Sequence, residues 1–225
     1  MSIYAISDLH LPLGVKKPMD VFGIRWNNYV ERIKENWINT VTEEDYVIIS
    51  GDISWATYLS EATADLEFIN SLPGTKILSR GNHDYWWTTL KKMNELKKKE
   101  GFDKINFLQN DSYMIGSVAV AGCRGWITPL EKKFGREDEK IYKRELLRME
   151  MSINDAVKKG AQKIILSTHY PPLSGFYEII EKYNVDIALY GHLHHETMGS
   201  YVEISERTKL VSCDYLSFFP EKIIL

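Results

Sequence analysis

Residues 76–84 read KILSRGNHD and decide the fold of this chain. The run Lys76–Ser79 is short and apolar, as in a buried strand, and it leads into a polar turn that carries Asn82, His83 and Asp84. Four other apolar runs end in the same way, and the polar residues that follow them are Asp8 with His10, Asp52, His169, and His192 with His194. Because functional residues of α/β sheets gather on the loops beyond the carboxyl ends of strands, we expect these side chains to meet at one edge.

The rest of the chain alternates strand-like and helix-like segments, which predicts an α/β fold. The expected strands are Ile3–Ser7, Tyr46–Ser50, Lys76–Ser79, Ile105–Leu108, Tyr113–Ile115, Val118–Gly122, Lys163–Leu166 and Ile187–Tyr190, with Tyr201–Ile204 and Leu210–Cys213 as closing antiparallel strands. The expected helices are Asn27–Thr40, Ala62–Leu72, Trp86–Lys99 and Asp138–Lys159. The segment Trp126–Glu137 has no periodicity, and we expect it to be a loop that shapes substrate access.

Length and composition indicate one soluble domain over residues 1–225. Acidic residues number 31 against 28 basic ones, so a net charge of −3 argues against nucleic acid as a partner. The two cysteines, Cys123 and Cys213, form neither a metal motif nor a secreted disulfide pattern, which favours a reducing cytoplasm. We expect neither a signal peptide nor a membrane span, and composition leaves the oligomeric state open.

The strand-end residues have the chemistry of metal ligands. Asp8 and His10 are two positions apart, so in extended backbone they point to the same face, and His192 and His194 repeat this spacing. Glycines precede Asp52, Asn82 and His192, where the backbone must turn sharply or approach a ligand. Carboxylate, imidazole and amide donors without thiolate suit Zn, Mn, Fe or Co.

Taken in order, the motifs D-x-H, GD, GNHD, H and GHxH resemble those of the calcineurin-like metallophosphoesterase superfamily. The resemblance implies a four-layer αββα sandwich, in which helices flank two mixed β-sheets and the metal site lies at the carboxyl ends of strands. It also implies two divalent ions, drawn from Mn, Fe, Zn and Co. The implied ligands are Asp8, His10, Asp52 and His194 for one ion, and Asp52, Asn82, His169 and His192 for the other.

The same resemblance implies a reaction, the hydrolysis of a phosphodiester or phosphomonoester by a hydroxide that bridges the two ions. His83 is the candidate catalytic residue that protonates the leaving oxygen or hydrogen-bonds the phosphoryl group. Asp84 is a second catalytic candidate, which orients His83 or another group near the metals. Arg80 and Arg124 lie near the ends of strands and are candidates for phosphate binding.

Other functions stay open at this point. A small phosphoester is the favoured substrate because no second substrate-binding domain is evident. The alternatives are an inactive scaffold of the same fold that binds protein partners, a nuclease, and a purely structural metal site. If the chain were an inactive scaffold, we would expect some of the metal ligands to be missing. A structural zinc site is usually rich in cysteine. His195 has no place in the motifs, and we expect it to be exposed or to support a ligand without binding metal.

Overall fold

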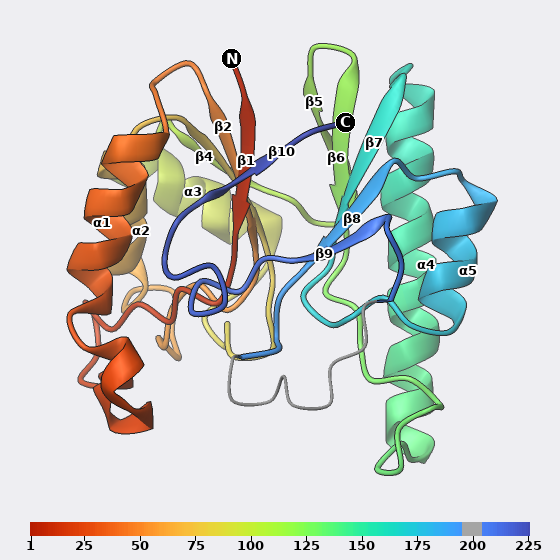
Figure 1. Ribbon diagram of the computed structural model, residues 1–225, viewed down its shortest axis with the longest axis horizontal. Coiled ribbons are helices and arrows are strands. Elements are labelled where there is room, and N and C mark those ends of the chain that lie inside the picture. Colours follow the sequence, from red (N-terminus) through yellow and green to blue (C-terminus); the bar gives the residue numbers. More distant parts are fainter. Residues whose placement is uncertain (195–203) are drawn as a thin grey trace.

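The computed structural model describes residues 1–194 and 204–225. In this part of the chain, two five-stranded sheets lie face to face, with helices on the outer face of each (Figure 1). The chain is therefore a four-layer α/β sandwich with two mixed sheets, as expected.

The first sheet has the order β10-β1-β2-β3-β4. Its strands are β1 (Ile3–Ile6), β2 (Tyr46–Ser50), β3 (Thr75–Ser79), β4 (Ile105–Phe107) and β10 (Glu221–Ile223). Strands β1 to β4 are parallel, and β10 joins the free edge of β1 in antiparallel orientation. Three neighbouring strands therefore end side by side, above Asp8, Asp52 and Asn82.

The second sheet has the order β5-β6-β7-β8-β9. Its strands are β5 (Ser112–Ile115), β6 (Val118–Gly122), β7 (Lys163–Ser167), β8 (Ile187–Tyr190) and β9 (Thr208–Leu210). The hairpin β5–β6 is antiparallel and the other pairs are parallel. The carboxyl ends of β7 and β8 point the same way as those of the first sheet, toward the lower end of Figure 1.

Helices complete the outer layers. Their bounds are α1 (Tyr29–Thr40), α2 (Thr63–Ser71), α3 (Leu90–Glu100), α4 (Arg136–Lys158) and α5 (Gly175–Lys182), with the short 3-10 helices η1 (Met19–Phe22) and η2 (Ile24–Trp26) before α1. Helices α1 and α2 lie outside the first sheet, and α4 and α5 lie outside the second (Figure 1). No helix in the described ranges is long and apolar enough to cross a bilayer.

Strand alternation explains the layers. Val47 and Ile49 of β2 pack in the core beneath α1 to α3, whereas Ile48 between them belongs to the core between the two sheets. In β7, Ile165 faces the first sheet while Leu166 packs toward α4 and α5. Successive side chains of a strand point to opposite faces, so apolar strands buried on both sides form one continuous sandwich.

The expected closing strands are partly wrong. Strand β9 begins earlier than expected, at Thr208, and it pairs with β8 in parallel, not antiparallel, orientation. Beyond β9, the chain crosses to the other sheet, where Ser212 forms a parallel bridge with Ser7. The pattern of Leu210–Cys213 indicates an extended segment but carries no information on its partner. The expected strand Tyr201–Ile204 lies outside the described residues except for Ile204.

Four short elements were not predicted, namely η1, η2, α5 and β10, and one helix begins late. Helix α5 packs against α4, and strand β10 pairs with β1. Helix α3 begins at Leu90, four residues after the expected start at Trp86. The indole of Trp86 is bonded to Asp84, and Thr89 accepts a hydrogen bond from the Lys92 backbone N–H as the N-cap. Residues 80–89 therefore belong to the loop that carries the polar side chains.

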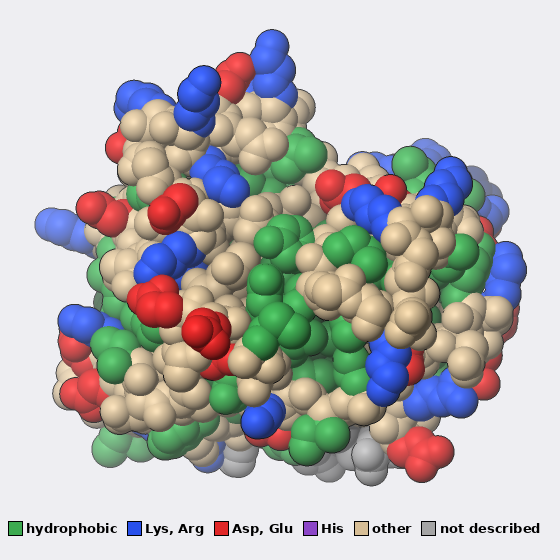
Figure 2. All heavy atoms as spheres, turned by 90° about the horizontal axis from the view of Figure 1, so that it is seen from above, with side chains coloured by type: hydrophobic (Ala, Val, Ile, Leu, Met, Phe, Trp, Pro, Cys, Tyr) green, Lys and Arg blue, Asp and Glu red, His purple; other side chains and the backbone are tan. Residues whose placement is uncertain are grey.

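Figure 2 shows the face at the upper end of Figure 1, where parallel strands begin. Apolar side chains gather near its centre and charged side chains lie mostly around them, and no histidine of the coloured residues is visible. The histidines that the motifs predict follow the carboxyl ends of strands, at the opposite end of the sandwich.

Candidate metal centre

The loops beyond the strand ends hold their polar residues in unusual backbone conformations. Asp8, His10, Asp52 and His192 have φ angles of 57°, 46°, 51° and 68°. The left-handed region costs about 1–2 kcal/mol for a residue that has a Cβ atom. Strain of this kind persists where the surrounding structure requires it, and it concentrates at functional sites.

The three glycines of the motifs allow the loops to approach one another. A Cβ on Gly81 would lie 2.1 Å from Asp52 Oδ1, and one on Gly191 would lie 2.2 Å from Asp8 Oδ2. Gly51 has a φ of +90°, and a Cβ there would lie 2.6 Å from the Gly81 Cα. The predicted need for close approach at these glycines is confirmed.

The first group of donor atoms comes from the loops after β1 and β8. One donor atom each from Asp8, His10 and His194 lies within 4.8 Å of the other two, so the three could hold one ion. His194 Nε2 is 3.8 Å from Asp8 Oδ1, and His10 Nε2 is 3.7 Å from Asp52 Oδ2. Asp52 thus lies at the border of this group.

The second group surrounds the Asn82 amide. Asn82 Oδ1 is 2.7 Å from His169 Nε2 and 2.9 Å from His192 Nδ1. His169 Nε2 is also 3.4 Å from Asp52 Oδ2, and donor atoms of Asp8, Asp52 and His169 lie within 4.8 Å of one another. The structure therefore brings all seven expected ligands into one neighbourhood, with Asp52 between the two groups.

The pKa values of these side chains show which of them are already deprotonated for cation binding. Burial lowers the pKa of His10 and of His192 to about 3, so both imidazoles are neutral at pH 7. Burial also opposes protonation of His169, but Asp52, Asp8 and the Ser50 carbonyl together outweigh it and raise the pKa of His169 to about 9. Burial acts to raise the pKa of Asp52, but His169, His10 and His83 together outweigh it, so that pKa lies below the ordinary value. Cations would compete with the His169 proton.

Neighbouring polar groups hold the candidate ligands in place. Asp8 is fully buried and accepts hydrogen bonds from the Ser7 hydroxyl, from Ser212 Oγ at 3.0 Å and from the His192 backbone N–H at 3.1 Å. His169 Nδ1 lies 3.1 Å from the Ser50 carbonyl oxygen, so once the ring loses its second proton this contact favours the tautomer with the proton on Nδ1 and Nε2 facing Asn82 and Asp52.

His83 lies at the edge of the site. Its backbone N–H donates to Asp52 Oδ1 at 2.7 Å, and its ring centroid lies 4.8 Å from that of Trp55 and 5.7 Å from that of His10. The side chain is half-buried, and burial lowers its pKa below the ordinary value. The imidazole also lines an open cavity beside the centre.

Asp84 makes its hydrogen bonds to loop backbone and to an indole. Oδ1 accepts from the backbone N–H groups of Ile53 and Ser54 at 2.9 and 3.3 Å, and from Trp86 Nε1 at 3.0 Å. Oδ2 accepts from the Gly81 backbone N–H at 2.7 Å. The fully buried carboxylate thus ties the Asp52 loop to the Asn82 loop, and its bonds go to these groups rather than to the His83 ring.

The two candidate phosphate-binding arginines face a different cavity. Arg80 and Arg124 line a cavity of about 90 Å³ together with Arg144 and Arg148 of α4, and none of the seven ligands lines it. Arg124 supports the centre through its carbonyl oxygen, which accepts from the His169 backbone N–H at 2.9 Å. The loop expected at Trp126–Glu137 is present up to Gly135, because α4 begins at Arg136.

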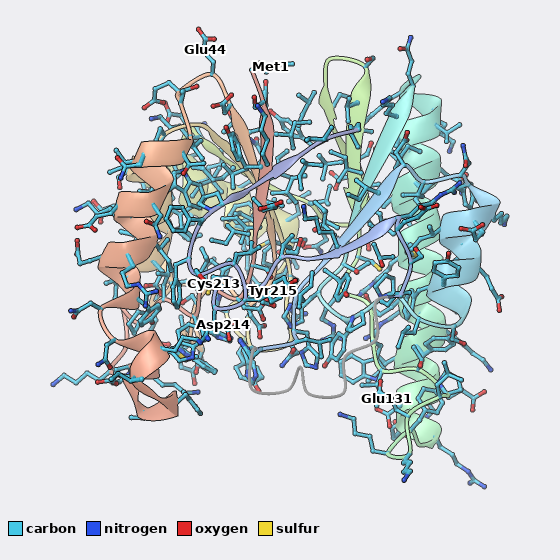
Figure 3. The ribbon with its side chains drawn as sticks, in the orientation of Figure 1. Met1, Glu44, Glu131, Cys213, Asp214 and Tyr215 are labelled. Carbon is cyan, nitrogen blue, oxygen red and sulfur yellow. The ribbon has the colours of Figure 1, made fainter. Side chains whose placement is uncertain are left out.

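Sequence reasoning missed Asp214. This buried carboxylate lies 3.1 Å from His194 Nδ1. Burial by itself would lower the pKa of His194, but the bond to Asp214 and the nearby carboxylates of Asp8 and Asp52 together outweigh it and raise that pKa. Figure 3 shows Asp214 between Cys213 and Tyr215, toward the lower end of the molecule. Asp214 follows the extended run Leu210–Cys213, so the strand-end rule would have found it. His195, the remaining histidine, lies outside the described residues.

The residues present fit divalent metal ions. The seven side chains offer imidazole nitrogens and carboxylate or amide oxygens, a donor set typical of first-row transition metals. The fully buried ring of His10 has no hydrogen-bond partner at Nδ1 within the described residues, and Asp8 and Asp52 are buried beside it. Buried carboxylates at such short range require compensating positive charge.

Comparisons with known proteins agree with this geometry. The family model for calcineurin-like phosphoesterases matches residues 1–196. No curated protein matches the chain. Similar solved structures include a protein of unknown function, AQ665, from Aquifex aeolicus (19% identity, TM-score 0.52, covering 98% of this chain and 95% of that one).

Two further structures resemble the chain at 14% identity. The phosphopantetheinyl hydrolase PptH from Mycobacterium tuberculosis has a TM-score of 0.54, and the match covers 99% of this chain and 95% of that one. TT1561 from Thermus thermophilus has a TM-score of 0.56, with coverage of 98% and 97%. These likenesses show the fold, and the family model shows the family. The chain belongs to the calcineurin-like phosphoesterase family.

Proposed function

We propose that this protein is a metal-dependent hydrolase of small phosphodiesters or phosphomonoesters. The observation that carries the proposal is the convergence of seven donor side chains from both sheets around Asp52. Membership of the calcineurin-like phosphoesterase family supports metal-dependent phosphoester chemistry in general.

The ligand set would hold two divalent ions, of Mn, Fe, Zn or Co. The proposed ligands are Asp8, His10, Asp52 and His194 for one ion, and Asp52, Asn82, His169 and His192 for the other. When bound, such ions lower the pKa of water and stabilise charge on phosphoryl oxygens. Asp52 contributes by lying between both groups, within 3.7 Å of His10 Nε2 and 3.4 Å of His169 Nε2.

His83 is the proposed catalytic residue. Its ring lies beside the ligands without belonging to either donor group, and it borders the cavity from which a substrate would approach. From there an imidazole N–H could hydrogen-bond a phosphoryl oxygen or pass a proton to the leaving oxygen. Asp84 acts differently in this proposal: it positions Asp52 and Asn82 by binding the backbone of both loops.

The test combines metal analysis with hydrolysis of bis-p-nitrophenyl phosphate by the chain, with and without added Mn²⁺. We expect up to two ions per chain and metal-dependent turnover that is lost in Asp52→Asn. Folded protein that binds metal without hydrolysing mono- or diesters would contradict the proposal and favour the scaffold. A single-stranded oligonucleotide tests the nuclease alternative, for which the net charge of −3 is unfavourable.

We also infer that residues 1–225 act as one metallophosphoesterase domain, because the core between the sheets draws on strands from Ala5 to Ile223. A reducing cytoplasm is the proposed location. Both cysteines, Cys123 and Cys213, are buried and unpaired in the structure, which is consistent with such a compartment.

A further inference from the structure

A large cavity opens directly beside the centre. Its volume is about 590 Å³, which is within the range of small-molecule sites. One wall consists of His10, His83 and His194, so the cavity and the ligands share side chains. A phosphoester bound at the centre would therefore extend its remaining part into this space.

A second wall, next to these histidines, comes from the two 3-10 helices before α1. Met19 and Trp26 are buried there, whereas Phe22 and Ile24 are 51% and 86% exposed. Trp55 closes the cavity on the side of His83. Large apolar side chains that stay exposed around a concave site mark a surface that binds apolar groups.

The charges in the lining offset each other. Apart from histidines, the charged side chains that line the cavity in the described part of the chain are Arg25 and Asp214. Arg25 Nη1 donates to the Asp214 carbonyl oxygen at 3.0 Å, and the Asp214 carboxylate lies 3.1 Å from His194 Nδ1. Among the lining residues, Arg25 is therefore already engaged by Asp214, and a further cation, Lys17, lies outside the lining with its Nζ 3.6 Å from the Trp55 ring centroid.

A hydrogen bond and aromatic contacts hold the two 3-10 helices against the candidate metal centre. Besides the Arg25 bond, the ring of Trp26 meets His194 edge-on at 5.8 Å and His10 at 6.3 Å. Arg32 of α1 donates to the Arg25 carbonyl oxygen at 2.7 Å. The apolar wall therefore has a defined position relative to the ligands.

From these observations we propose that the cavity binds an uncharged hydrocarbon group of the substrate, so that the substrate is a phosphoester of an apolar alcohol. This inference rests on the proposed function for its chemistry, but the cavity can be tested without turnover. The hydrocarbon could be the alkyl chain of a lipid-like ester or the ring of an aryl ester, and the experiment separates the two.

The first arm measures kcat/KM of the Mn²⁺-loaded protein for methyl, butyl and octyl p-nitrophenyl phosphate and for the 2-naphthyl ester. We expect kcat/KM to rise up to about fourfold per methylene until the cavity is filled, the factor that corresponds to ~0.8 kcal/mol per buried methylene. A greater gain for octyl than for naphthyl assigns an alkyl chain, and the reverse assigns a ring. Methyl, octyl and naphthyl esters all hydrolysed within about twofold of one another would overturn the proposal.

The second arm uses variants on one short segment. The double variant Phe22→Ser/Ile24→Asn should lower the octyl-to-methyl ratio of kcat/KM by about tenfold, because it removes apolar area from the wall. Val21→Ser is the matched control: Val21 lies on the same 3-10 helix as Phe22 and is 75% exposed, but it does not line the cavity. An equal fall in the octyl-to-methyl ratio of kcat/KM in both variants would contradict the proposal that Phe22 and Ile24 bind the hydrocarbon group.

The third arm measures binding alone, by calorimetry with octylphosphonate and methylphosphonate, which are not hydrolysed. Tighter binding of octylphosphonate, lost in the double variant, supports the cavity even if no ester is turned over. In that case the proposed function fails and the cavity stands. Hydrolysis of all esters without a chain-length effect has the opposite meaning: the function stands and the cavity proposal is wrong.

Discussion

Replacing Asp84 by asparagine tests whether this carboxylate positions the metal ligands or takes part in the chemistry. Its two oxygens accept four hydrogen bonds, three from backbone N–H groups of the Asp52 and Asn82 loops and one from the Trp86 indole. In Asp84→Asn one oxygen remains for Ile53, Ser54 and Trp86. The new NH₂ group then faces the Gly81 N–H, donor against donor.

The size of the effect follows from these contacts. Loss of a hydrogen bond to a charged acceptor costs about 1.5–3 kcal/mol, and leaving a buried donor unsatisfied costs about 1–3 kcal/mol. We therefore expect Asp84→Asn to lower the free energy of unfolding of the metal-free protein by about 3 kcal/mol. Because the two loops carry Asp52 and Asn82, we also expect metal affinity to fall about 10–100-fold, as is usual when a group that supports ligands is removed.

The assay measures three quantities on one preparation: urea unfolding, Mn²⁺ affinity by competition with a fluorescent chelator, and kcat for bis-p-nitrophenyl phosphate. Asp45→Asn is the matched control. The Asp45 carboxylate is also buried and accepts from the backbone N–H groups of Ser2 and Thr42, but it lies before β2, away from the centre. This control should lose stability and keep wild-type metal affinity.

Two results would refute the reasoning. Wild-type metal affinity in Asp84→Asn, with the expected loss of stability, would mean that Asp84 does not position the ligands. Wild-type affinity combined with a large fall in kcat would make Asp84 a catalytic residue, as the sequence analysis allowed.

Three further outcomes are expected. His83→Ala should keep its bound metal and lose about 10²–10⁴-fold in turnover; full activity would exclude the catalytic role. Gly81→Ala places a Cβ 2.1 Å from Asp52 Oδ1, so metal content should fall while Gly101→Ala, where a Cβ meets nothing within 4 Å, keeps it. Burial lowers the pKa of Lys76 from 10.5 to about 7. Between pH 7 and 10.5 the Lys76 amine is therefore protonated in the unfolded chain and neutral in the folded protein. Because the unfolded state binds more protons, the free energy of unfolding rises with pH in that window. From pH 7 to 9 this contribution is about 2 kcal/mol, and urea unfolding of Lys76→Met should lack it; an unchanged pH slope would contradict the assignment.

The local sequence was sufficient to predict most of the fold. Continuous apolar runs such as Tyr46–Ser50 end at glycine and polar residues, so both the strands and the positions of their polar ends could be read directly. The order of the motifs then placed Asp8, Asp52 and Asn82 at strand ends, and these are neighbours in the structure. The resemblance of the motifs to one family supplied the expected pairing of ligands with ions.

Contacts between distant segments could not be predicted in this way. The sequence pattern of β9 is that of an extended strand and would be the same in a parallel or an antiparallel pair. Its parallel orientation follows only from its pairing with β8. Asp214 supports His194 because the chain after β9 crosses to Ser7 of the first sheet, and Asp214 lies beyond the residues that the family model matches. Arg80 and Arg124 follow the expected strand-end pattern, yet their side chains face a separate cavity.

The sequence by itself therefore determined which side chains reach the edge of the sandwich, because strand alternation and glycine turns are local properties. Only the tertiary structure decided what each of them faces. The bonds of Asp84 to both loops and the apolar wall from Met19 to Trp26 beside His10 arise from packing between segments far apart in the chain. Such packing depends on the whole arrangement of the sheets, for which no short stretch of sequence carries a signal.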